Sequence, residues 1–257
     1  MTIDTDRLTV TNPDIDTLLT TALSHHRSIL VSGAMTAGKT TLLRHIASLL
    51  PTDARIGTVE HRPELCLDEL PGRGSTVTTT AFGSNDDITR SLQRFTSHPV
   101  DYICLGDITG PEVLDLFAAQ IATAAASLAT IHATSARGAV DRLITLAMEG
   151  PDVDEAAAKR LISDHIDLII HIDPSQGHGL VTGSATDRIV EIAWLFTHFD
   201  STAELDLNYH YPFTFGDFTT QLDASPAPRL RDRPAPRDHV FGKTFARNLP
   251  VRTRKES

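Results

Sequence analysis

The feature that most constrains the fold is a glycine-rich turn between two apolar segments, within residues 29–43. It contains the pattern Gly-x-x-x-x-Gly-Lys-Thr, which runs from Gly33 to Thr40. The apolar run before the pattern predicts a buried strand, and the leucines after it predict a helix. A strand, this turn and a helix in that order are the context in which the pattern forms a phosphate-binding loop. The sequence therefore predicts a nucleoside triphosphatase fold.

The residue types in the loop suit phosphate chemistry. Gly33 and Gly38 permit backbone conformations that are closed to residues with a Cβ, which lets backbone N–H groups approach phosphate oxygens. The helix that follows points the positive end of its dipole at the same place. Lys39 is expected to reach the β- and γ-phosphates of ATP, and the Thr40 hydroxyl to ligate Mg²⁺. The predicted nucleotide-binding residues are Gly33, Ala34, Met35, Thr36, Ala37, Gly38, Lys39, Thr40 and Thr41.

Composition narrows the class of protein. The 257 residues are 40% hydrophobic and 22% charged, as in an ordinary globular protein with a substantial core. The net charge is −10, but residues 224–257 hold nine Lys/Arg and three Asp/Glu, so residues 1–223 carry −16. A body this acidic argues against nonspecific duplex binding, and no specific nucleic acid is expected as a partner.

Cysteine usage and hydropathy indicate the compartment. Cys66 and Cys104 provide no disulfide framework, and Cys104 lies in an apolar run that should be buried. Both points favour a reducing, cytoplasmic setting. The polar N-terminus does not resemble a signal peptide, and no apolar stretch approaches the ~20 residues of a membrane-spanning helix. The histidines do not pair with cysteines at zinc-ligand spacing, so Mg²⁺ is the one metal expected.

Strand-like and helical segments alternate along the chain. This alternation predicts an α/β fold with a mainly parallel sheet, helices on both faces and an antiparallel hairpin near the end. The last helix is expected to have Asp152 as its cap, with Glu155 three residues later. Strands are expected near residues 29–32, 55–60, 75–80, 101–105, 127–132, 168–172 and 188–195, and helices near 13–26, 39–50, 86–97, 111–123, 135–148 and 152–165.

Three further segments place acids and a histidine at strand ends. A P-loop enzyme needs an acid that serves Mg²⁺ or the attacking water. A strand that ends in Gly-Asp is a weak signal alone, because many buried strands do so, but the other two segments strengthen it. The segments are residues 55–65 with Glu60 and Glu64, residues 101–107 ending in Gly106 and Asp107, and residues 127–135 with His132 followed by hydroxyls.

In this order, the phosphate-binding loop and the three segments resemble the hexameric secretion and pilus ATPases of type II and type IV secretion, including the tight-adherence pilus branch. The resemblance runs from Ser28 to Leu195, and its most specific element is the Ala-Thr-Ile-His-Ala-x-Ser box at residues 129–135. It implies a RecA-like motor whose ring, expected to be a hexamer, couples ATP hydrolysis to pilus assembly or export. The implied partner is an inner-membrane platform protein, and the implied location is the cytoplasmic face of that membrane.

The resemblance also implies roles for individual residues. Glu60 would lie near the attacking water, with Glu64 as the second acid of its box. Asp107 would activate the water, and His132 would lie near the γ-phosphate. Plainer alternatives remain open: Glu64 could be a solvated loop charge, and His132 could simply bond to the backbone.

Two arginines on a predicted helix resemble family residues that neutralise phosphate in the same or an adjacent subunit. They are Arg90 and Arg94, four residues apart. The alternative is a solvated helix face.

The chain departs from the family pattern at several points. His61 stands where an acid usually follows Glu60, and residues 95–100 lack the usual arginine-rich turn. Asp107 is one methylene shorter than the usual glutamate, which predicts weak hydrolysis that Asp107→Glu would accelerate. The competing expectation is a site adapted around aspartate, with Glu60 as the base. About 28 residues precede the first strand, where the family has an N-terminal domain. The chain is therefore expected to be a minimal motor, a subunit completed by another polypeptide, or a divergent copy.

Four regions are expected: an N-terminal helical lead-in, a RecA-like ATPase motor domain, an ambiguous extension, and a disordered basic tail rich in proline and arginine. Their bounds are 1–27, 28–200, 201–223 and 224–257.

The leading function is a cytoplasmic ATPase that drives secretion, pilus or conjugation machinery. The first alternative is a non-hydrolysing ATP-binding subunit that regulates such a machine. A phosphotransferase is disfavoured because the His box and the paired glutamates have no role there, and a DNA-translocating motor is disfavoured by the acidic body.

Overall fold

The computed structural model describes residues 13–60, 62, 64–74, 77–81, 85–173, 189–199 and 205–208. Seven strands form one sheet in the order β3-β2-β4-β5-β1-β6-β7, and β8 and β9 form a separate two-stranded sheet. The strands are β1 (Ile29–Gly33), β2 (Ile56–Glu60), β3 (Val77–Ala81), β4 (Tyr102–Ile108), β5 (Ala126–His132), β6 (Leu168–Ile172), β7 (Ile189–Trp194), β8 (Phe196–Phe199) and β9 (Leu205–Asn208).

The first six strands are parallel, and β7 pairs antiparallel with β6. The predicted mainly parallel sheet and C-terminal hairpin are therefore confirmed. Strand β5 lies between β1 and β4. Because parallel strands end at the same edge, the segments that follow β1, β2, β4 and β5 meet at one edge of the sheet.

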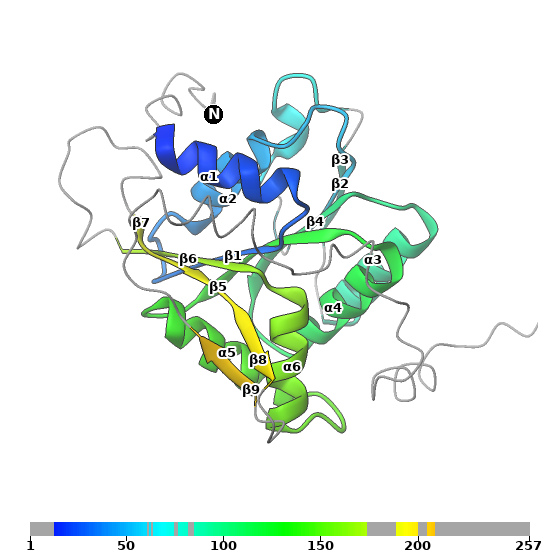
Figure 1. Ribbon diagram of the computed structural model, residues 1–257. Helices are drawn as coiled ribbons and strands as arrows, with labels where there is room; N and C mark the ends of the chain where they lie inside the picture. The colour runs from blue at the N-terminus through cyan, green and yellow to red at the C-terminus, as the bar shows by residue number, and fades with distance from the viewer. Residues whose placement is uncertain are drawn as a thin grey trace, which may run out of the picture.

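Helices cover both faces of the sheet (Figure 1). α1 and α2 pack in one hydrophobic core, and α3 to α6 pack in the other. None of the described helices is long and apolar enough to cross a membrane. The helices are α1 (Pro13–Ser24), α2 (Lys39–Ser48), α3 (Asn85–Ser97), α4 (Glu112–Thr123), α5 (Ala136–Met148) and α6 (Glu155–His165), with a short 3-10 helix, η2 (Leu67–Glu69).

The central strands are buried on both sides, as expected for a parallel sheet between two helical layers. In β1, Ile29 and Val31 face α1 and α2, whereas Leu30 faces the other core. Cys104 is fully buried in β4, as predicted, and is a free thiol. Helix α1, in the predicted lead-in, packs in the same core as α2, so it is an integral part of the fold.

Two local predictions were wrong. The strand expected to close at Leu105 continues to Ile108. The cap of α6 is Asp154, whose side chain accepts a hydrogen bond from the Ala157 amide, and not Asp152. Asp152 has φ 60°, whereas Asp154 has the extended backbone that directs a capping side chain at the first free amides. The basic tail expected at residues 224–257 lies outside the described residues.

The contact between β2 and α3 gives a test of the packing. A Cβ on Gly57 would lie 2.3 Å from the Phe95 ring. Gly57→Ala should therefore destabilise the protein by about 1–3 kcal/mol, because the buried ring would have to move. Gly74→Ala is the matched control, since the nearest atom to its Cβ among the described residues would be the Asp68 carbonyl oxygen at 3.6 Å. Urea unfolding measures both, and equal midpoints for the two variants would contradict the expectation.

Candidate active site

The phosphate-binding loop joins β1 to α2 and contains two residues with positive φ. Thr36 has φ 62°, and Gly38, which precedes α2, has φ 101°. Gly33 is needed for close approach, because a Cβ there would lie 2.8 Å from both the side chain and the carbonyl oxygen of Ile172 on β6. The predicted nucleotide-binding residues differ in exposure. The exposed ones are Ala34, Met35, Thr36 and Thr41, the half-buried ones are Gly38 and Thr40, and the buried ones are Gly33, Ala37 and Lys39.

The Lys39 ammonium lies under this loop. Its Nζ donates to the carbonyl oxygens of Gly33 and Ala34 at 3.4 and 3.2 Å. It also lies 3.1 Å from His132 Nδ1 and 3.9 Å from Asp107 Oδ1. Burial lowers the pKa of Lys39, and the nearby Asp107 carboxylate partly offsets this by raising it. The folded chain therefore brings a partly desolvated cation, a carboxylate and an imidazole together.

A β-bulge in β4 decides which face of the sheet Asp107 occupies. The register between β4 and β5 slips after Leu105, so that Asp107 pairs with Thr130. Strict alternation would place Asp107 on the same face as Leu105, which packs in the core beneath α3 to α6. The extra residue, Gly106, instead brings Asp107 to the face of α2 and the phosphate-binding loop.

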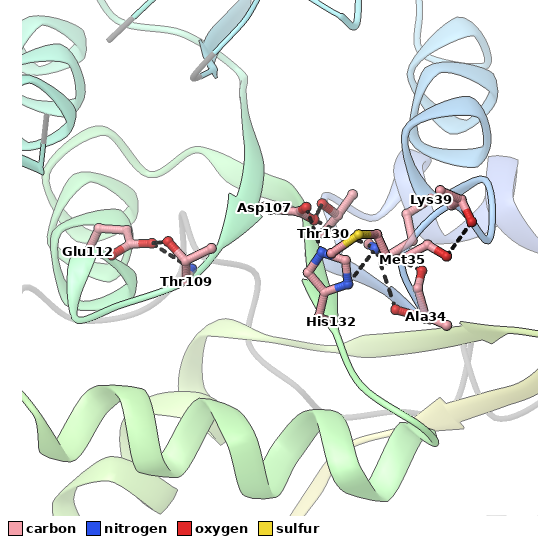
Figure 2. A network of polar contacts seen from close by, with 10 residues as sticks. Ala34, Met35, Lys39, Asp107, Thr109, Glu112, Thr130 and His132 are labelled. Carbon is pink, nitrogen blue, oxygen red and sulfur yellow. Dashed lines mark hydrogen bonds and ion pairs between the residues drawn. The ribbon is translucent and has the colours of Figure 1, made fainter. Parts of the chain in front are cut away.

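His132 lies between Lys39 and Asp107, as Figure 2 shows. Because an ammonium can only donate, the contact with Lys39 makes Nδ1 the acceptor and assigns the ring proton to Nε2. Nε2 is 3.1 Å from Asp107 Oδ2, so it donates to that oxygen. The Thr130 hydroxyl donates to the other carboxylate oxygen, Oδ1, at 2.5 Å. Both oxygens of Asp107 are thus held by side chains of β5.

Glu60 ends β2 on the same face and anchors the loop that follows. Its buried Oε2 accepts hydrogen bonds from the amides of Glu64 and Leu65 at 2.9 and 2.8 Å. Arg44 on α2 donates to the Leu65 carbonyl oxygen at 3.0 Å. Glu64 itself is exposed. One oxygen of Glu60 is therefore engaged in holding backbone, which leaves Asp107 as the acid in contact with the Lys39 and His132 side chains.

The turn after β4 is closed by a buried glutamate. Glu112 Oε1 accepts hydrogen bonds from the Thr109 amide at 2.7 Å and the Gly110 amide at 2.9 Å (Figure 2). This contact fixes the end of the strand that carries Asp107.

The two predicted phosphate-neutralising arginines are on the opposite side of the sheet from α2. Arg90 and Arg94 are exposed on α3, whose apolar face packs in the core of α4 to α6. The fold does not bring either side chain onto the face that carries Lys39, Asp107 and His132. A role toward an adjacent subunit stays a prediction.

A second polar cluster, not foreseen from the sequence, lies on that opposite face. Ser32 Oγ and buried His171 Nδ1 are 3.0 Å apart, and Glu191 pairs with His171 in the β6–β7 register. Burial lowers the pKa of His171, while Glu191 and Asp173 raise it in part. Glu191 Oε2 also accepts from the Ala136 amide at 2.6 Å, at the start of α5. The strand before the phosphate-binding loop and the helix after the His box are both held here.

The anchoring role of Glu60 has a direct test. Glu60→Ala should speed hydrogen exchange at the Glu64 and Leu65 amides by roughly tenfold to a hundredfold, because hydrogen bonds to a charged acceptor contribute about 1.5–3 kcal/mol. Glu60→Gln keeps an acceptor oxygen and should have a smaller effect. Glu64→Gln, on an exposed side chain, is the control. Unchanged exchange at both amides in Glu60→Ala would refute the role.

The sequence is similar to a known protein family and to several of its characterised members. The family described as type II/IV secretion system protein matches residues 1–174. Type IV secretion system protein PtlH of Bordetella pertussis is 27% identical over 187 residues, which cover 69% of this chain and 52% of PtlH. Type IV secretion system protein VirB11 of Brucella suis is 24% identical over 169 residues, with 62% and 46% covered. The chain spans about half the length of the curated relatives it matches.

Solved structures show the same fold. The VirB11 ATPase of Brucella suis, in complex with sulphate, superposes with a TM-score of 0.60 at 24% identity, covering 71% of this chain and 52% of that one. The pilus retraction motor PilT with bound ADP gives a TM-score of 0.50 at 16% identity, covering 85% and 57%. The fold is therefore RecA-like, as predicted. Since the family match extends over more than half of the sequence, the chain belongs to the type II/IV secretion system protein family.

Proposed function

We propose that this chain binds Mg-ATP and hydrolyses it. The observation that carries the proposal is the cluster of side chains at the edge of the sheet where the parallel strands end. There Lys39, under the phosphate-binding loop, contacts His132 and lies 3.9 Å from Asp107. A cation at the start of a helix can bind the phosphate oxygens of ATP, and an adjacent carboxylate can accept a proton from the attacking water.

The residues present fit a nucleotide. The phosphate-binding loop is solvent-facing, and Gly38 precedes α2 in a left-handed conformation that turns the backbone at the helix start. Lys39 would exchange its carbonyl partners for phosphate oxygens. Thr40, half-buried in the first turn of α2, would help to hold Mg²⁺, which supplies charge neutralisation on the phosphates when bound.

Asp107 would accept the proton of the attacking water. Its carboxylate is held by donors on both oxygens yet remains partly exposed, with 41% of the side chain accessible. His132, donating from Nε2, would orient Asp107, and its acceptor Nδ1 would help to position Lys39 near the γ-phosphate. Glu60 would position the loop of Glu64.

We infer that hydrolysis drives a secretion, pilus or conjugation machine. Family membership supports this, as do the relatives named for type IV secretion and pilus retraction. The proposed partners are further copies in a ring, expected to be a hexamer, and an inner-membrane platform protein at the cytoplasmic face.

The departures from the family pattern at His61 and Asp107 favour one alternative, an ATP-binding subunit that regulates a machine without hydrolysing ATP. Magnesium-dependent turnover by the purified chain separates the two functions.

ATP binding should depend on Lys39. Lys39→Ala should weaken binding of a fluorescent ATP analogue by at least about a hundredfold, because the loop loses its cation for the β- and γ-phosphates. Lys159→Ala is the matched control, since Lys159 lies on α6 paired with Glu155. If Lys39→Ala and the parent bound the analogue with equal affinity, the proposed function would be refuted.

The identity of the base is tested by single-turnover hydrolysis. Asp107→Asn should lose about 10²–10⁴-fold in rate, the usual contribution of a general base, with ATP affinity little changed. Glu60→Gln should lose much less, since glutamine can still accept from the loop amides. The reverse result, with Glu60→Gln inactive and Asp107→Asn active, would assign the base to Glu60.

A further inference from the structure

We propose that Thr130 is a positioning residue that holds Asp107 for water activation and fits the site to aspartate instead of glutamate. The inference rests on the proposed function and names a residue that the sequence did not single out. Thr130 lies in β5, two residues before His132 and on the same face.

The contact joins a fixed donor to a carboxylate that would otherwise be loosely held. Thr130 is 3% exposed, and a β-branched side chain has few rotamers in a strand. Its hydroxyl donates to Asp107 Oδ1 at 2.5 Å. The Asp107 side chain is 41% exposed, so solvent contact alone would leave its carboxylate mobile. The hydrogen bond from buried Thr130 restricts that motion.

Together the two donors on β5 define the plane of the carboxylate. Thr130 takes Oδ1, and His132 Nε2 takes Oδ2 at 3.1 Å. Because Thr130 and His132 are two residues apart on one strand, their spacing is set by the backbone. Lys39 lies 3.9 Å from Oδ1, on the side where the phosphates of ATP are expected.

The fit depends on side-chain length. The bulge makes Asp107 the direct register neighbour of Thr130, so the short aspartate side chain suffices to reach the hydroxyl. A glutamate would carry its carboxylate about 1 Å or more beyond the donor, a displacement that can cost on the order of a hundredfold in rate. The shorter acid therefore fits this site, and Asp107→Glu should slow hydrolysis. This reverses the leading expectation from the sequence, that Asp107→Glu would accelerate hydrolysis, and agrees with the competing expectation of a site adapted around aspartate.

A buried threonine on β2, the strand on the other side of β4 from β5, provides a matched control. Thr58 is fully buried, and its Oγ1 has no hydrogen-bond partner among the described residues. It lies two residues before Glu60, as Thr130 lies two residues before His132. Thr58→Val removes the same hydroxyl from the same kind of position without removing a hydrogen bond.

The experiment measures single-turnover ATP hydrolysis and ATP affinity for the full chain. Thr130→Val should lose about tenfold to a hundredfold in rate, the range expected for a hydrogen bond to a charged group, with affinity unchanged. Thr130→Ser keeps the donor and should stay within about threefold of the parent, like Thr58→Val. In an Asp107→Asn background, Thr130→Val should cause little further loss, since Thr130 acts through Asp107.

Several results would overturn the proposal. Parent-like hydrolysis by Thr130→Val would do so, as would an equal loss in Thr130→Ser and Thr130→Val. Faster hydrolysis by Asp107→Glu would do so even if Thr130→Val failed to fold.

A readout independent of activity keeps this inference separate from the proposed function. In urea unfolding, the midpoint shift of Thr130→Val with Asp107→Ala should be smaller than the sum of the two single shifts. Additive shifts would refute the contact. A parent that binds ATP without hydrolysing it, with non-additive shifts, would refute the proposed function and leave the Thr130–Asp107 contact established.

Discussion

The bulge at Gly106 is the constraint on which the site depends. In a regular strand the Asp107 carboxylate would lie with Ile103 and Leu105 in the apolar core beneath α3 to α6. An unpaired carboxylate there would be costly, because burial of a charge without partners is strongly unfavourable. One extra residue moves Asp107 to the other face, where Thr130, His132 and Lys39 supply donors and positive charge. The bulge therefore keeps the Asp107 carboxylate out of the apolar core and also brings it to the side chains of the cluster.

The side chains of the cluster compensate one another's charges and polar groups. Lys39 has carbonyl oxygens and an imidazole as partners, and Asp107 has a hydroxyl and an imidazole N–H. Each partly buried charge is therefore compensated by a partner of opposite charge or by a hydrogen bond. The contacts of Lys39 are ones that phosphate oxygens can replace.

Periodicity made most of the fold predictable, and irregular backbone set the limit. Apolar runs before Gly33 and Asp107 identified buried strands, and Gly-Lys-Thr identified the loop between β1 and α2. Alternation alone could not show that Asp107 changes face, because a bulge depends on how two strands pair. For the same reason Thr130 was missed, since its importance follows from being the register neighbour of Asp107. The Asp154 cap was missed because two aspartates compete two residues apart.

The phosphate-binding loop is fixed to β6 from both faces of the sheet. Gly33 seats against Ile172 on the α2 face, and the preceding Ser32 bonds His171 on the other. His171 is best accommodated neutral, because burial lowers its pKa and leaves its Nδ1 in contact with a hydroxyl. Through Glu191, the same hairpin holds the start of α5 directly after the His box. The phosphate-binding loop and the segment that follows His132 are therefore both fixed to the β6–β7 hairpin, so a displacement of this hairpin would move both.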